Sequence, residues 1–84
     1  MEVEIGRVTH YFGKIGVAII ELTAAGLKIG DSIRIFGNTT DFIQTIESMQ
    51  IEHQSITEAN PGQTIGLKTT GPVREHDIVY KVTP

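Results

Sequence analysis

The fold is decided by two stretches, Gly26-Leu27-Lys28-Ile29-Gly30-Asp31-Ser32-Ile33-Arg34-Ile35 and Ala59-Asn60-Pro61-Gly62-Gln63-Thr64-Ile65-Gly66-Leu67. Each stretch places glycine beside a polar residue just before an alternating apolar run, the pattern of a chain that reverses and re-enters a sheet. In the second stretch Pro61 fixes its own φ, and Gly62 supplies the positive φ of a type II turn. Two such corners in one short chain predict a small closed or nearly closed β-barrel, a class that commonly binds ligands on its loops and rims.

Composition limits what this barrel can do. With 84 residues, the chain is expected to form a single domain spanning residues 1–84 and to bury only about 60–65% of its unfolded-state surface. The absence of cysteine excludes disulfides, thiolate metal sites and thiol catalysis. Ten acidic and seven basic side chains give a formal charge of −3, which argues against nonspecific nucleic-acid binding through a net basic surface.

No signal for membrane insertion or secretion is evident in the sequence. No run approaches the ~18 apolar residues of a membrane span. The start, Met1-Glu2-Val3-Glu4, lacks the basic and apolar regions of a signal peptide. We therefore expect a cytoplasmic protein without membrane contact.

Most of the chain has the residue pattern of β-strands. Residues 3–12 are rich in β-branched and aromatic residues, but the odd spacing of Ile5 and Val8 requires a bulge, expected near Gly6. Residues 17–22 are apolar on both faces, as in a central strand. Further strands are expected at residues 32–36, 64–69 and 78–82.

Residues 42–51 form the longest strand candidate, and a helix is its competitor. The apolar residues partly fit a helical face and also fit a bent strand. Thr45, Ser48 and the β-branched residues favour the strand. The count is then six strands, which predicts an all-β fold, a small six-stranded antiparallel, Greek-key-like β-barrel.

Catalytic and metal-binding patterns are missing from the sequence. Residues 62–69 resemble a phosphate-binding P-loop, but the spacing of Gly62, Gly66 and Lys68 does not match, and a strand follows instead of a helix. The three histidines, His10, His53 and His76, lie on separate elements without the spacing of metal ligands. We therefore expect no enzyme, with no catalytic, cofactor-binding or metal-binding residue.

Two interpretations of the basic residues remain open. All seven are scattered singly along the chain. Strand alternation could bring Arg7, Arg34 and Lys68 onto the outer face of adjacent strands, where they would meet a phosphate backbone. The alternative is a solvated surface of mixed charge, which is common in small barrels.

An ordered set of short motifs resembles a known family. The motifs are Gly6-Arg7-Val8, Phe12-Gly13, Gly26-Leu27-Lys28-Ile29-Gly30-Asp31, Ser48-Met49-Gln50-Ile51, the stretch 58–67 and Asp77-Ile78. Together they resemble domain 2 of translational GTPases, most closely the β-barrel of elongation factors Tu and one-alpha. The resemblance implies a barrel of the translation-protein type that touches the acceptor end of tRNA, ribosomal RNA or a neighbouring GTPase domain.

The chain departs from this family's pattern at several positions. No GTPase domain is present, so neither binding nor hydrolysis of GTP is implied. Gln50 stands where the pattern has a glutamate against the terminal adenosine of tRNA, and Gln63 and Thr64 replace an acidic residue and asparagine. Tyr80-Lys81 stands where the pattern has Arg-Gly.

Two non-enzymatic hypotheses follow. In the first, the barrel contacts tRNA, the ribosome or a partner translation protein, with Arg7, Gln50, Thr64 and Lys68 around the contact surface. In the second, it is a structural or protein-interaction domain without an RNA role, for example an appendage of a collagenase-like peptidase, which docks through a strand edge or an apolar rim. The family resemblance favours the first hypothesis, and the acidic charge balance favours the second.

Overall fold

The regular structure of the protein is entirely β. A computed structural model describes residues 1–83 and assigns them no helix. Within this described part, no helix is long and apolar enough to cross a membrane. The strands are β1 (Glu2–Phe12), β2 (Val17–Leu22), β3 (Leu27–Lys28), β4 (Ser32–Phe36), β5 (Asp41–Thr45), β6 (Met49–Ile51), β7 (Gln54–Ile56), β8 (Glu58–Ala59), β9 (Thr64–Lys68) and β10 (Ile78–Val82).

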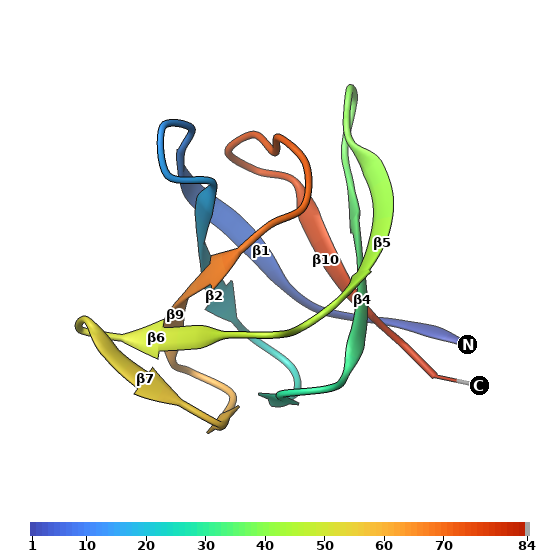
Figure 1. The fold of residues 1–84 in the computed structure, drawn as a ribbon. Helices are drawn as coiled ribbons and strands as arrows, with labels where there is room; N and C mark the ends of the chain where they lie inside the picture. Colours follow the sequence, from blue (N-terminus) through green and yellow to red (C-terminus); the bar gives the residue numbers. More distant parts are fainter. Residues whose placement is uncertain (84) are drawn as a thin grey trace.

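These strands form the predicted antiparallel barrel. The main sheet has the order β5-β4-β10-β1-β2-β9-β6-β7, and β3 pairs with β8 in a separate two-stranded sheet. β5, at one end of the sheet, leads directly to β6, next to the other end, because the two are the halves of the expected bent strand, interrupted at residues 46–48. Figure 1 shows this segment crossing from β4 to β9. The expected count of six holds for the wall if β5 and β6 count as one, and β3, β7 and β8 were not predicted.

The bulge in β1 lies where the residue spacing required it. The register with β10 shifts between Glu4 and Gly6. Both Ile5 and Val8 are consequently fully buried. A Cβ on Gly6 would collide with the carbonyl oxygen of Glu21 on the neighbouring strand, so only glycine allows β1 and β2 to approach this closely.

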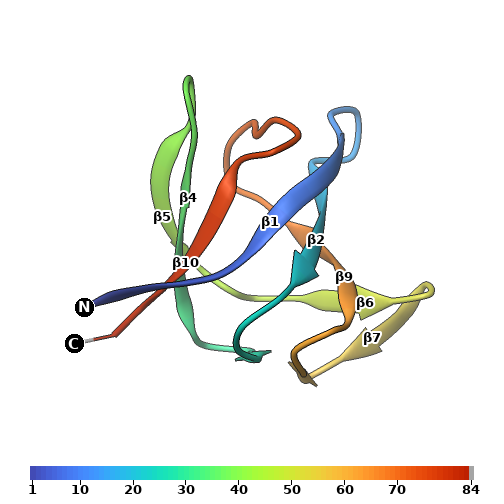
Figure 2. The same ribbon diagram turned by 180° about the vertical axis from the view of Figure 1, so that it is seen from behind.

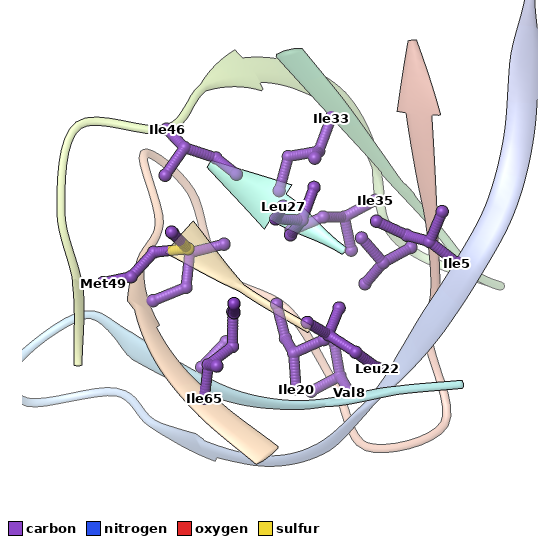
Figure 3. Close-up of a cluster of buried hydrophobic side chains, with 14 of the residues drawn as sticks. Ile5, Val8, Ile20, Leu22, Leu27, Ile33, Ile35, Ile46, Met49 and Ile65 are labelled. Carbon is purple, nitrogen blue, oxygen red and sulfur yellow. The ribbon is translucent and has the colours of Figure 1, made fainter. Parts of the chain in front are cut away.

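Isoleucine, leucine and valine fill the barrel interior. Figure 3 shows side chains from opposite walls meeting in the centre, among them Ile5, Ile33 and Ile65. Every second residue of β2 and β4 is buried, the alternation expected of strands that present one face to a core. Each fully buried aliphatic side chain contributes about 1.5–3 kcal/mol relative to exposure.

A glutamine side chain closes the seam between β5 and β9, which do not pair as strands. Gln44 is 7% exposed. Its Nε2 donates to the carbonyl oxygen of Lys68 at 3.0 Å, and its Oε1 accepts from the backbone N–H of Thr70 at 2.9 Å. The amide group therefore replaces a missing ladder contact and satisfies its own polar atoms.

Replacing Gln44 by leucine should weaken the barrel selectively. Gln44→Leu removes both hydrogen bonds and leaves backbone groups without their partner, which costs about 1–3 kcal/mol. Urea unfolding measures the loss. The control is Gln54→Leu at an exposed position of β7, which should change stability by less than about 0.5 kcal/mol. Equal effects of the two substitutions would contradict the role of Gln44.

An ion-pair cluster fastens three strands near the chain ends. Arg34 on β4 makes a bidentate contact with Asp41 on β5, with Nε–Oδ1 at 2.7 Å and Nη2–Oδ2 at 2.8 Å. Its Nη1 donates to Glu2 on β1 at 3.1 Å, and its guanidinium lies 4.8 Å from the centre of the Phe36 ring. The hydrogen bonds from Arg34 lower the pKa of Asp41, and those to Asp41 and then Glu2 raise the pKa of Arg34.

This cluster predicts a pH dependence of stability. Because the pKa of Asp41 is lowered in the folded chain, its stabilising contribution is complete above about pH 4, the ordinary value of aspartate. The contribution is lost as the pH falls through the lower pKa of the folded state. Asp41→Asn should therefore lower the melting temperature at pH 7, and its difference from the parent should shrink at about pH 2.5. Thermal melts of Glu47→Gln provide the control, and a pH-independent difference would contradict the prediction.

Both described chain ends lie on one side of the barrel. The terminal amine of Met1 donates to the Thr83 carbonyl at 2.6 Å, and the Thr83 N–H donates back to the Met1 carbonyl at 2.8 Å. Figures 1 and 2 show the ends together, on the side away from the β6–β7 hairpin.

Candidate functional site

An open, mainly apolar groove of about 630 Å³ lies on one face of the barrel. We call this hollow the β9 groove. It lies over β2, β9 and β6 and is bounded by the turn after β1 and by the β6–β7 turn. Its apolar lining residues are Phe12, Ile15, Val17, Ile19, Ile51 and Ile65, and the others are Gln50, Glu52, His53, Gln63, Thr64 and Gly66.

A glycine forms the floor of the β9 groove. Buried Ile65 and Leu67 alternate in β9 with Thr64, Gly66 and Lys68, which are not buried. Gly66 pairs with Ile19 of β2 on one side and with Gln50 of β6 on the other. A Cβ at this position would lie 3.6 Å from Val17 Cγ1 and 3.8 Å from Ile19 Cδ1. A Cβ there would therefore make only ordinary contacts, and Gly66 itself is partly exposed beside the larger side chains of β2.

The apolar wall of the β9 groove comes from the turn between β1 and β2. Phe12 is 46% exposed and Ile15 is 62% exposed, although both are large apolar residues. Gly16, with φ of 67°, and a hydrogen bond from its N–H to the Phe12 carbonyl at 2.9 Å hold this turn. The barrel core does not require these side chains, because they lie outside it.

The opposite wall ends in a turn with an unfavourable backbone. Glu52 and His53 have φ values of 50° and 66°, and they join Ile51 to Gln54 in a two-residue hairpin. Positive φ at both central residues defines a type I′ turn, which is usually built from Asn-Gly. Two ordinary residues in this conformation store strain next to the groove, and such strain is often found at functional sites.

Relieving this strain should stabilise the chain. His53→Gly removes the steric penalty of a left-handed residue, and after the entropy cost of glycine we expect a gain of about 0.5–1 kcal/mol in the free energy of unfolding. Urea unfolding measures it. Ser55→Gly in the adjacent strand is the matched control and should destabilise by about 0.5–1 kcal/mol. A loss of stability in His53→Gly would contradict the prediction.

The charge of the β9 groove does not suit nucleic acid. Among the described residues that line it, Glu52 carries the only carboxylate, and no lysine or arginine is present. Phosphate backbones are bound by basic side chains that replace counterions. The groove is suited instead to an apolar ligand with hydrogen-bonding groups, which Gln50 and Gln63 can engage.

The structure brings together only part of the predicted contact set. Gln50 and Thr64 line the β9 groove. Arg7 lies one strand beyond, where its Nη2 is 3.7 Å from Glu21 Oε1, and Glu21 is also the ladder partner of Thr64. Lys68 extends from the far end of β9 and lines a second hollow. The set remains a prediction, since no contact with a ligand tests it.

The possible basic face does not form. Arg7 lies on β1, Lys68 on β9 and Arg34 on β4, and these strands are not adjacent in the sheet. Arg34 is also engaged by Asp41 and Glu2. The alternative, a surface of mixed charge, describes these residues better.

The histidines lie apart, on different elements. His10 Nδ1 lies 3.3 Å from Glu75 Oε1, with both side chains more than half exposed. Within residues 1–83 no group of three or more histidine, aspartate or glutamate side chains is placed to hold a metal ion. His53 is the one histidine that lines the β9 groove.

Sequence reasoning missed the apolar wall and the β6–β7 hairpin. The hairpin lacks a glycine or asparagine in its turn, so it gave no turn signal. The apolar wall, in contrast, could have been found from Ile15. A large apolar residue between Gly13 and Gly16 in a predicted turn has no core to enter, so its side chain is expected to be exposed. Exposed apolar residues on a rim are a common sign of a binding surface.

The fold and groove together define a small β-barrel with an apolar groove on its surface, and comparison with known proteins specifies it further. No protein-family model matches the chain. Over 80 residues, or 94% of its length, the chain is 45% identical to a protease of Methanocaldococcus jannaschii that is named as uncharacterised. It is 36% identical over 95% of its length to a collagenase of Porphyromonas gingivalis. The chain spans only about one fifth of these relatives, 19% and 20% of their lengths.

Two solved structures share the fold. The C-terminal domain of a Geobacillus thermoleovorans protein described as a U32 peptidase superposes with a TM-score of 0.88 and 24% identity, over 95% of this chain and 92% of that one. GDP-bound aIF5B from Aeropyrum pernix superposes with a TM-score of 0.67 and 16% identity, over 98% of this chain but 15% of that one. At these identities the likeness is one of fold.

These findings correct the expected family. The assignment to domain 2 of elongation factors is wrong, and so is the translation role that it implied, because the similar sequences belong to a protease and a collagenase. The likeness to aIF5B is confined to a small part of that protein. The alternative hypothesis, an appendage of a collagenase-like peptidase, is confirmed. In the relatives, the matching segment is a small part of a protease and of a collagenase, and the similar solved structure is a C-terminal domain of a protein described as a U32 peptidase.

Proposed function

We propose that this barrel is a non-catalytic accessory domain of a collagenase-like peptidase and that its β9 groove binds an extended segment of the polypeptide substrate. The observation that carries the proposal is an open apolar groove in a chain that is 36–45% identical to one fifth of a collagenase and of a protease. Binding would hold substrate near a catalytic part that lies elsewhere in such a protein.

The chemistry of the groove supports a polypeptide ligand. Apolar walls from Phe12 and Ile15 offer area for side chains, and the amide of Gln50 and the NH2 group of Gln63, whose oxygen accepts from the Asn60 N–H, offer hydrogen bonds to a peptide backbone. An extended ligand also exposes its backbone, which can approach the floor closely at Gly66 because this partly exposed residue has no side chain.

The position of the chain ends supports an external ligand. Met1 and Thr83 are hydrogen-bonded to each other on the side of the barrel away from the β6–β7 hairpin. A catalytic part joined through either end would begin on that side. The β9 groove would then be left open to substrate.

Peptide titration tests the proposal. The probe is an acetylated, amidated (Gly-Pro-Leu)₃ peptide, a single-chain mimic of denatured collagen. We expect the amide signals of Gly66, Gln50 and Thr64 to shift in NMR spectra of the labelled chain, with a Kd of about 0.1–1 mM. Mass spectrometry should show the peptide uncut.

Two matched substitutions locate the binding surface. Ile15→Ser removes an exposed isoleucine from the groove wall and should weaken binding about tenfold, since burying that side chain contributes about 1–2 kcal/mol. Ile29→Ser removes a 38% exposed isoleucine outside the groove and should leave Kd unchanged. Absence of shifts with the parent chain, or equal weakening by both substitutions, would refute the proposal.

A further inference from the structure

A second hollow lies at the far end of β9, around Lys68. It has a volume of about 600 Å³ and is lined by Lys68, Thr69 and Thr70 after β9 and by residues of β5 and the loop that follows it. Lys68 pairs across the ladder with Val17, which lines the β9 groove. The Val17–Lys68 pair is therefore the junction between the residues that line the two hollows.

Lys68 presents an available positive charge at this junction. Its backbone carbonyl accepts from Gln44, but within residues 1–83 its ammonium group makes no ion pair. Arg7, Arg34 and Lys81, in contrast, are each paired with a carboxylate. Lys14, Lys28 and Arg74 also make no ion pair among the described residues, but of these four cations only Lys68 lies on β9, the strand beneath the groove.

We propose that Lys68 selects substrate segments with an acidic side chain, aspartate or glutamate, next to the apolar residues bound over Gly66. The inference rests on the proposed function, since it assigns a specificity to the same groove. Successive outward positions of a strand lie about 7 Å apart, so Gly66 and Lys68 would face neighbouring ligand side chains on one face of an extended peptide.

An internal acidic residue fits better than a chain terminus. The surface beyond Lys68 is also hollow and is lined by Thr70 and Ile43 among others, so a bound chain has room to run on. From Thr64 to Thr70 the chain covers about 20 Å if extended, enough for about six extended ligand residues. Because Glu47 lines the second hollow together with Lys68, we place the acidic ligand side chain on the side of Lys68 that adjoins Val17 and the β9 groove.

The test compares peptides that differ only in one charge. Glutamate or glutamine replaces each leucine of the capped (Gly-Pro-Leu)₃ peptide in turn, and Kd is measured with the parent chain, Lys68→Gln and the control Lys28→Gln. At one position, glutamate should bind about two- to fivefold more tightly than glutamine in low salt, the size of an exposed ion pair. This preference should fall in high salt and disappear in Lys68→Gln, while Lys28→Gln retains it.

The outcomes separate this inference from the proposed function. If the neutral peptide binds but glutamate gives no preference, or the preference survives in Lys68→Gln, the role of Lys68 is refuted. The proposal that the β9 groove binds peptide is then unaffected. If no peptide binds, the proposed function fails as well. A preference only for an uncapped peptide, through its terminal carboxylate, would overturn the assignment to an internal acidic residue.

Discussion

The structure depends on one bent strand that links β4, near one end of the sheet, to β9, near the other. β5 pairs with β4, and three residues later β6 pairs with β9. At the bend, the N–H of Ile46 donates to the Asp31 carbonyl and its own carbonyl accepts from Gly30, both at 2.9 Å, while its side chain is buried. The bend is thus stabilised by the buried side chain of Ile46 in the core and by backbone hydrogen bonds to the turn before β4. Without it, the sheet would have two open edges and no enclosed core.

Much of this architecture could be predicted because it is encoded locally. Gly62, with φ of 90°, and the hydrogen bond from Gln63 to Asn60 form the corner that the Pro-Gly pair predicted. The conflict between Ile5 and Val8 predicted the bulge in β1, since no regular strand buries both. The turn at Glu52 and His53 could not be predicted, because neither residue is typical of a turn with positive φ, and the pairing of β6 with β7 encloses them in it.

The candidate site was predicted only in part, and the reason is physical. Gln50 and Thr64 do line the β9 groove, but they were chosen from a likeness to translation factors. The residues that carried this likeness were mainly the glycine and proline corners that close a barrel, and these identify a fold without identifying a ligand. The charge of the lining distinguishes this groove from a nucleic-acid site, because a groove with no basic lining residue cannot neutralise phosphates.

The groove also shows how barrel construction and binding compete for the same residues. A side chain larger than glycine fits at Gly66, where a Cβ makes ordinary contacts, so closure of the sheet does not require glycine there. Glycine in a strand interior weakens it, and exposed Phe12 and Ile15 add apolar surface that the core does not use. Gly66, Phe12 and Ile15 are thus three residues that do not maximise the stability of the barrel, and all three line the same groove. A ligand that covers this apolar surface would recover free energy in proportion to the area removed from water, at about 25 cal/mol per Å² before the costs of association.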